Sequence, residues 1–131
     1  MKVFSFFCQA AVPGPDGTIT FVRSGITRFA DPKPGQHHQA ALVVGVCYDP
    51  SEQGQHEMDI VGVNADGKRV WQHRNPFDLP KAGGNHMYLT AFQTVLGVGL
   101  YELHVYVDSK LVDTLPFEVA PAQPATTGLP E

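Results

Sequence analysis

Charge is scarce in this sequence, and positive charge is the scarcer sign. The 131 residues include 9 Lys and Arg against 13 Asp and Glu, which gives a net charge of −4. Proteins that hold the phosphate backbone of nucleic acids usually cluster Lys and Arg on one surface. Here these residues are dispersed along the chain and form no basic run. We therefore do not expect nucleic acid to be a partner.

Cysteine is equally rare, with Cys8 and Cys47 as the two examples. Both fall in apolar segments, and no C-x-x-C pair supports a zinc or redox site. We expect two buried free thiols in a reducing compartment, and the alternative is an oxidised pair in a secreted sandwich domain.

Long hydrophobic runs are also missing, since no stretch approaches the ~20 apolar residues of a membrane helix. The first eleven residues resemble a signal peptide only superficially. Their apolar core is about six residues and contains Ser5, against the ~7–15 residues usual for such peptides. We expect this segment to be the first strand of a cytoplasmic protein that does not contact a membrane.

The clearest pattern that is present lies between Gly99 and Val119. Apolar residues at positions 101, 103, 105 and 107 alternate with polar ones, which predicts a strand with one buried face. Residues 108–110 read as a polar turn, and a return strand follows. Pro116 cannot donate a hydrogen bond to a neighbouring strand, so we expect the return strand at or near a sheet edge, or with a bulge there.

Gly99 stands two residues before Tyr101, at the entry to this first strand. That spacing resembles the tyrosine corner of immunoglobulin-like sandwiches, in which a Tyr hydroxyl binds the backbone upstream. The alternative is that Tyr101 is an ordinary core aromatic residue that follows a loop.

Similar alternation and turn signals predict about eight strands and no helix. The expected ranges are 2–11, 18–29, 38–48, 56–63, 68–73, 86–94, 101–107 and a return strand that ends at Val119. Gly25 would mark a bulge or a switch between sheets, and residues 75–85 read as irregular. Segment 38–48 is apolar on both faces and should be a central strand.

These strands predict an all-β protein with one domain over residues 1–120. We expect a two-sheet immunoglobulin-like β-sandwich in which early strands pair with late ones, and the alternatives are a jelly roll and an open barrel. Residues 121–131 form a Pro-, Ala- and Thr-rich tail that would be disordered unless it is docked.

No set of residues points to catalysis, a cofactor or a metal. The histidines occupy positions 37, 38, 56, 73, 86 and 104 without the spacing of a ligand pair. If the strands on either side of Gly97 form a hairpin, His104 lies opposite Thr90 and His86 opposite Asp108. The turn residues Asp16, Asp49, Asp66 and Asp108 are expected to shape backbone turns rather than to hold calcium.

An aromatic surface is the remaining candidate site. Trp71 is the single tryptophan and stands near Arg69 and His73, and Tyr106 is a further exposed candidate. Exposed aromatic rings can stack on sugars or anchor a protein partner. The alternative is that Trp71 belongs to the core, where single tryptophans are mostly found.

The order of these segments resembles an uncharacterised bacterial family of small cytosolic β-sandwich proteins, a domain of unknown function. The matching pieces are residues 21–25, 42–50, 59–67, 99–108 and 116–119. The resemblance implies a fold but brings no activity and no functional residues.

We therefore expect a non-catalytic interaction or accessory module that binds a protein partner or a second copy of itself. A small-ligand or carbohydrate-binding module around Trp71 is the alternative. A metal-dependent enzyme built on the histidines is a third hypothesis.

Overall fold

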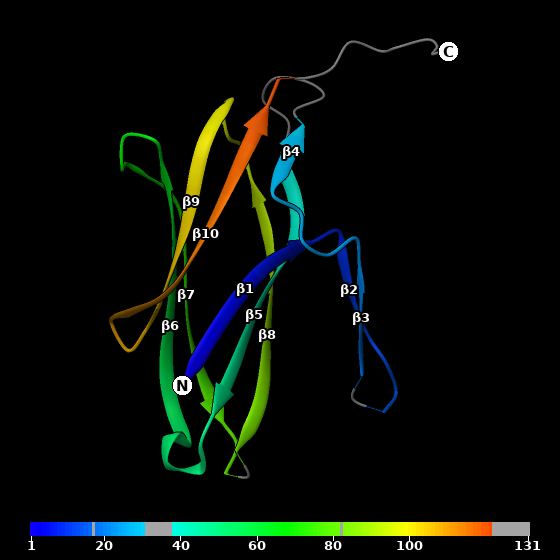
Figure 1. The fold of residues 1–131 in the computed structure, drawn as a ribbon, viewed down its shortest axis with the longest axis vertical. Coiled ribbons are helices and arrows are strands. Elements are labelled where there is room, and N and C mark those ends of the chain that lie inside the picture. The colour runs from blue at the N-terminus through cyan, green and yellow to red at the C-terminus, as the bar shows by residue number, and fades with distance from the viewer. Residues whose placement is uncertain (17, 31–37, 82, 122–131) are drawn as a thin grey trace.

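The computed structural model describes residues 1–16, 18–30, 38–81 and 83–121 as two β-sheets packed face to face (Figure 1). The smaller sheet contains β1 (Lys2–Cys8), β5 (His38–Tyr48) and β8 (Gly84–Thr94), in that order. The larger sheet has the order β4-β10-β9-β6-β7. Its strands are β4 (Arg28–Ala30), β10 (Lys110–Ala120), β9 (Gly99–Val107), β6 (Gly54–Asn64) and β7 (Arg69–Leu79).

A separate two-stranded hairpin, β2 (Ala10–Pro13) and β3 (Ile19–Val22), projects beside the sandwich (Figure 1). A short 3₁₀ helix, Pro50–Glu52, links β5 to β6 and so joins the two sheets at one end. No helix in the described ranges is long and apolar enough to span a membrane.

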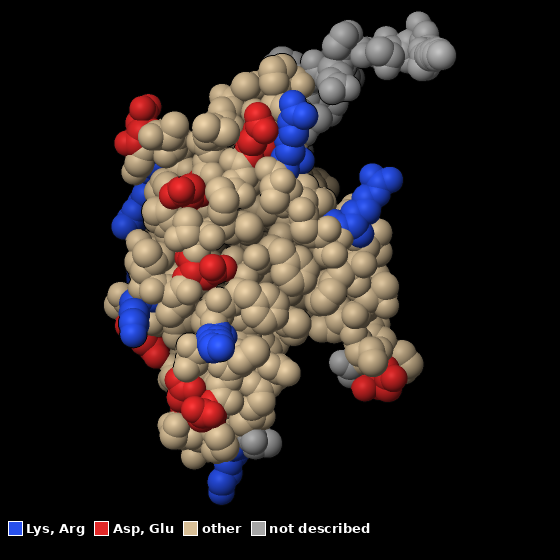
Figure 2. Space-filling model, viewed as in Figure 1, with Lys and Arg blue, Asp and Glu red and all other residues tan. Residues whose placement is uncertain are grey.

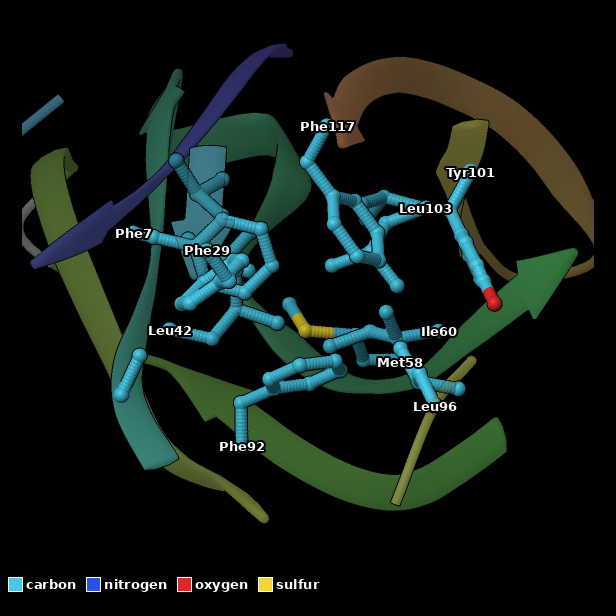
Figure 3. Packing of buried hydrophobic residues seen from close by; sticks show 14 of the residues in the cluster. Phe7, Phe29, Leu42, Met58, Ile60, Phe92, Leu96, Tyr101, Leu103 and Phe117 are labelled. Atoms are coloured by element: carbon cyan, nitrogen blue, oxygen red, sulfur yellow. The ribbon is translucent and has the colours of Figure 1, made fainter. Parts of the chain in front are cut away.

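The core lies between the two sheets and is rich in phenylalanine (Figure 3). Phe7 packs against Phe29, Phe92 and Phe117 with ring centroids 5.0–5.3 Å apart, mostly edge to face. Leu42, Met58, Ile60 and Leu103 fill the remaining space and are fully buried. Alternate residues of β9 point into this core, which confirms the predicted period-two pattern in that strand.

The strand order and one hydrogen bond make the sandwich immunoglobulin-like. The sheet β10-β9-β6-β7 corresponds to strands G, F, C and C′ of variable-type domains, and β1-β5-β8 corresponds to the facing sheet. The Tyr101 hydroxyl donates to the Gly97 carbonyl oxygen at 2.6 Å. The predicted tyrosine corner is therefore confirmed, and so is the predicted sandwich.

Gly25 separates two strands rather than bending one. The predicted strand 18–29 consists of β3 in the hairpin and β4 in the larger sheet, and Gly25 between them has φ +82°. β4 runs parallel to the end of β10, so an early strand pairs with the last one. The sheet switch at Gly25 is confirmed, although as a break in the strand.

Two predictions about the middle of the chain are wrong. Residues 75–79 belong to β7, because Pro76 sits on an edge strand where its missing N–H costs no ladder bond. The strands on either side of Gly97 lie in different sheets and form no hairpin. His104 is instead opposite Val61 and Thr114, and His86 is opposite Val46.

Pro116 occupies the position that its chemistry requires. β4 covers β10 only at residues 118–120, so β10 is locally an edge at Pro116. The described part of the chain ends at Pro121. The prediction that the tail is disordered or docked therefore concerns residues outside the described ones.

Candidate interaction surface

The four residues predicted to form a binding surface divide between two faces of the larger sheet. Trp71 faces inward, and its ring contacts Phe92 edge to face at 5.0 Å. His73 stacks beside Trp71 at 6.1 Å and its Nε2 lies 2.7 Å from the Tyr88 hydroxyl. Trp71 and His73 thus close the sandwich between β7 and β8.

Arg69 and Tyr106 lie on the outer face. Tyr106 is flanked by the core-facing residues Val105 and Val107, so strand alternation directs it outward. Arg69 is opposite Val63, beyond a register shift in β7 that leaves Trp71 opposite Gly62. The structure therefore does not bring the four side chains together.

His56 is held by two acceptors. Its Nδ1 is 2.6 Å from Asp108 Oδ2 and its Nε2 is 2.6 Å from the Glu52 carbonyl oxygen. Both ring nitrogens must donate to satisfy both partners, which favours the imidazolium. The hydrogen bond to Asp108 and then that to Glu52 raise the pKa of His56 above its ordinary value. The His56–Asp108 contact attaches the β9–β10 turn to β6. Because no ring nitrogen of His56 is left to accept a proton, this histidine is unsuited to base catalysis.

No group of three or more His, Cys, Asp or Glu side chains converges as a metal site within the described ranges. Position 37 and the side chain at position 38 lie outside what the structure describes. The hypothesis of a histidine-based metal enzyme accordingly gains no support from geometry.

Cys8 and Cys47 are both free thiols at opposite ends of the β1–β5 ladder. Cys8 is opposite Ala41 and Cys47 is opposite Lys2, six residue pairs away. Six strand steps correspond to roughly 20 Å, far beyond disulfide reach. Burial raises the pKa of the Cys8 thiol.

The outer face of the smaller sheet is apolar over its whole width. Three cross-strand rows form it, and we call this set the apolar face. The rows are Phe4, Gly45 and Met87; Phe6, Val43 and Leu89; Cys8, Ala41 and Ala91. In β1, β5 and β8 together the sequence has a single Lys, Lys2, and no Arg, Asp or Glu.

Side chains on the apolar face are packed in a definite way. The Phe4 ring lies over Gly45, where an added Cβ would overlap the ring. Phe4 stacks with Phe6 at 6.3 Å, and Phe6 contacts Phe21 of the β2–β3 hairpin at 5.2 Å. Val43 beneath is fully buried, while Phe4 is 41% exposed. Where the rows end in small Ala residues, a hollow of about 370 Å³ lies between β2 and β8.

The outer face of the larger sheet is polar by contrast. An ion pair joins Arg74 to Asp59 at 3.2 Å, and His104 Nε2 lies at hydrogen-bonding distance, 2.9 Å, from Glu102 Oε1. A further pair, Arg28 to Glu118, has its nitrogen and oxygen 3.6 Å apart. In Figure 2 acidic and basic groups gather where β6, β9 and β10 lie, and a broad area without charge lies between them and the β2–β3 hairpin.

The sequence pattern does not reveal the apolar face, because segment 38–48 is apolar at both alternations and predicts a strand that is buried on both sides. It is indeed the central strand of its sheet, as predicted. The available signal was that 86–94 and 2–8 also carry apolar residues at both alternations, with almost no charge. Three such strands cannot all have both faces covered in a two-layer sandwich.

One further hollow, of about 640 Å³, lies on the polar side. Leu100, Pro116 and Val63 line it, with Glu102 and Glu118 among its polar residues. Leu100 is 64% exposed. The volume of this hollow is within the range of sites that bind small molecules.

Solved structures with a related arrangement are distant in sequence. An immunoglobulin-like protein from Pseudomonas aeruginosa is 14% identical with a TM-score of 0.44, over 91% of this chain and 97% of that one. The alkylpurine DNA glycosylase AlkC from Pseudomonas fluorescens, bound to DNA containing an abasic site analog, is 11% identical with a TM-score of 0.47. The match covers 91% of this chain and 30% of the glycosylase, so the chain spans less than a third of that protein. No curated protein matches the sequence.

A sequence profile of one family matches residues 3–120, from the second residue of β1 to the end of β10. The predicted resemblance to a domain of unknown function with an immunoglobulin-like pattern is thereby confirmed. The chain belongs to DUF6941, a family of unknown function.

Proposed function

We propose that this chain is a non-catalytic interaction module that binds another protein through the apolar face. The observation that carries the proposal is the near absence of charge on three adjacent strands. An antiparallel sheet with one solvated face normally alternates apolar and polar residues. Here the solvent side of β1, β5 and β8 carries Phe4, Met87 and Leu89 instead. Contiguous exposed apolar surface of this kind is typical of protein interaction sites.

The shape of the face also suits a protein better than a small molecule. Its three rows extend across three strands and decline in size from Phe4 to the alanines, so a partner that covers the face must be broad. Protein interfaces combine such an apolar centre with a polar rim. Lys2 and Asn85 at one end, and Gln39 and Gln93 at the other, would supply the rim.

A cytoplasmic location is part of this proposal. Cys8 and Cys47 are separated by the length of the β1–β5 ladder and cannot pair within one chain. Free thiols in both positions suit a reducing compartment.

A photo-crosslinking amino acid placed at position 4 or at position 114 tests the proposal in the cells that make the protein. Phe4 is on the apolar face, and Thr114 is an exposed residue of β10 on the polar side. We expect a single protein to be captured from position 4 and not from position 114.

Purified partner then provides the quantitative measurement. Phe4→Glu should weaken its binding at least tenfold in calorimetry, and the matched control Thr114→Glu should not change it. Circular dichroism confirms that both variants are folded. Equal binding by Phe4→Glu, or capture from position 114 alone, overturns the proposal.

A second candidate function is the binding of a small apolar ligand in the hollow beside Leu100. The observation that favours it is the large exposed fraction of Leu100 within a 640 Å³ space. Native mass spectrometry of protein purified from its own cells should then show a retained mass. Leu100→Lys should lose that mass, and Val98→Lys, which changes an exposed residue outside the hollow, should keep it.

A further inference from the structure

We propose that two copies of this chain pair along the free edge of β8 and join their smaller sheets into one. The contact uses the strand's backbone rather than the apolar face, and it rests on the proposed function only for the use of the widened face. Within the described ranges β8 is hydrogen-bonded to β5 alone. Every second residue of β8 therefore directs its N–H and C=O away from the sheet.

The other edges of the sandwich carry features that discourage strand pairing. β7 has Arg69, Arg74, Pro76 and Asp78 along its length. β4 is three residues long and begins with Arg28. Charges, proline and short length are the usual means by which proteins protect sheet edges.

The edge of β1 is protected by a neighbouring strand, because β10 of the larger sheet lies beside it. The Ser5 hydroxyl donates to Asp113 Oδ2 at 2.5 Å, which ties the two strands together.

β8 has none of these protective features. It is eleven residues long, it has no Lys, Arg, Asp, Glu or Pro, and its pairing with β5 runs without a bulge. Its inner side is held in place, since Tyr88 binds His73 and Phe92 contacts Trp71. A long, uncharged and regular edge is a template for another strand.

The sequence of β8 is also compatible with a copy of itself. Antiparallel pairing over its full length places Leu89 opposite Leu89 of the second copy and Met87 opposite Ala91. No like charges meet in this register. The same operation on β7 would place Arg74 opposite Arg74 and would lose a hydrogen bond at Pro76. Of these two edges on the same side of the sandwich, the observations select β8.

Pairing would create a six-stranded sheet with the order β1-β5-β8-β8-β5-β1. The two apolar faces would then be continuous across a twofold axis at Leu89. Such an assembly closes on itself, because a twofold contact uses the same strand of both copies. It leaves Phe4 at the far edges, free to contact a further protein.

Charge exchange at the axis tests this register directly in the full-length chain. Analytical ultracentrifugation should show a dimer for the unaltered protein. Leu89→Lys and Leu89→Glu should each be monomeric, because like charges would face each other. An equimolar mixture of the two variants should dimerise again, with at least a tenfold stronger association than either variant alone. The control variants Thr114→Lys and Thr114→Glu should remain dimers.

Hydrogen exchange distinguishes a dimer that forms through the β8 edges from a dimer that forms through the apolar faces. Alternate amides of β8 should exchange at least tenfold more slowly in the dimer than in the diluted monomer. Phe4→Glu should leave the dimer intact even when it abolishes binding of another protein, so the two proposals fail separately. A chain that is monomeric at all concentrations overturns the inference. So does a dimer that survives Leu89→Lys or disappears with Phe4→Glu.

Discussion

The outer faces of the two sheets differ in their content of charged residues. Strands β1, β5 and β8 carry one charged residue, whereas the five strands of the larger sheet carry charges on every strand. The ion pairs Arg74–Asp59 and Arg28–Glu118 and the hydrogen bond between His104 and Glu102 all belong to the larger sheet. The charged groups of the polar face contact water, whereas the apolar face is the one that we propose a partner covers.

Packing among the side chains on the outer side of a sheet can therefore be as specific as packing in a core. Phe4 lies over Gly45 on one face, and Val43 is fully buried on that same face. On the other face the nearly buried residue is Val61, whose cross-strand neighbours are Gln72 and His104. Two buried valines at solvent faces thus have apolar neighbours in one case and polar neighbours in the other.

The largest loss of folding stability is expected when a carboxylate replaces the buried valine on each outer face. Val43→Asp should destabilise the fold by about 3–5 kcal/mol, because Phe6 and Leu89 beside it offer no hydrogen bond to a buried charge. Val61→Asp should cost only about 1–3 kcal/mol, since His104 and Gln72 can donate to it. Urea denaturation measures both values. Equal costs would show that the two faces do not differ in the way described.

A smaller effect concerns the aromatic ring over the glycine. Gly45→Ala should destabilise by about 1–3 kcal/mol because the new methyl group displaces Phe4. Combined with Phe4→Ala, the same change should be neutral or stabilising, because Ala suits a strand interior better than Gly. A double-mutant cycle in urea therefore measures the coupling. Additive effects would mean that Phe4 does not rest on Gly45.

The smallest effect is a pH dependence that belongs to the larger sheet alone. The pKa of His56 is raised by Asp108, so its contribution is present below the ordinary value of 6.5 and is lost as pH rises through the folded-state pKa. The Asp108 pKa is lowered, first by the Glu57 amide and then by His56, so its contribution is present above 3.8 and is lost at lower pH. Because Asp108 is half exposed, we expect a change below about 1 kcal/mol.

Thermal unfolding between about pH 6 and pH 9 provides the measurement. His56→Gln should flatten the decline with rising pH, and adding Asp108→Asn should change little more, since one interaction is lost in both cases. A decline that persists in His56→Gln would assign the pH dependence to another group.

Local patterns in the sequence were sufficient for much of this fold. The alternation from Tyr101 to Val107, the polar turn at 108–110 and the Gly99–Tyr101 spacing predicted a hairpin and a tyrosine corner that are both present. These features depend on residues close together in the chain, where side-chain period and turn chemistry act directly.

The pairing of strands that are distant in the sequence could not be predicted from such local patterns. β8 and β9 follow each other closely but lie in different sheets, and the Tyr101 hydroxyl binds the Gly97 carbonyl oxygen where the chain crosses. Turn-forming residues predict an irregular segment over 75–85, although an edge strand tolerates Pro76. The candidate site depends on which side of three strands faces water, and that is decided by the sheet into which each strand is placed. The predicted grouping of Trp71 with Tyr106 failed to assemble for the same reason.

The placement of the two thiols gives the molecule a built-in chemical reporter. Cys47 is half-buried next to Asn85 at the border of the apolar face, whereas Cys8 is fully sequestered. An alkylating reagent should therefore label the first long before the second. The labelling rate at Cys47 then reports whether that border is covered, in the cell and without any substitution in the chain. Labelling of Cys8 would report unfolding in the same experiment.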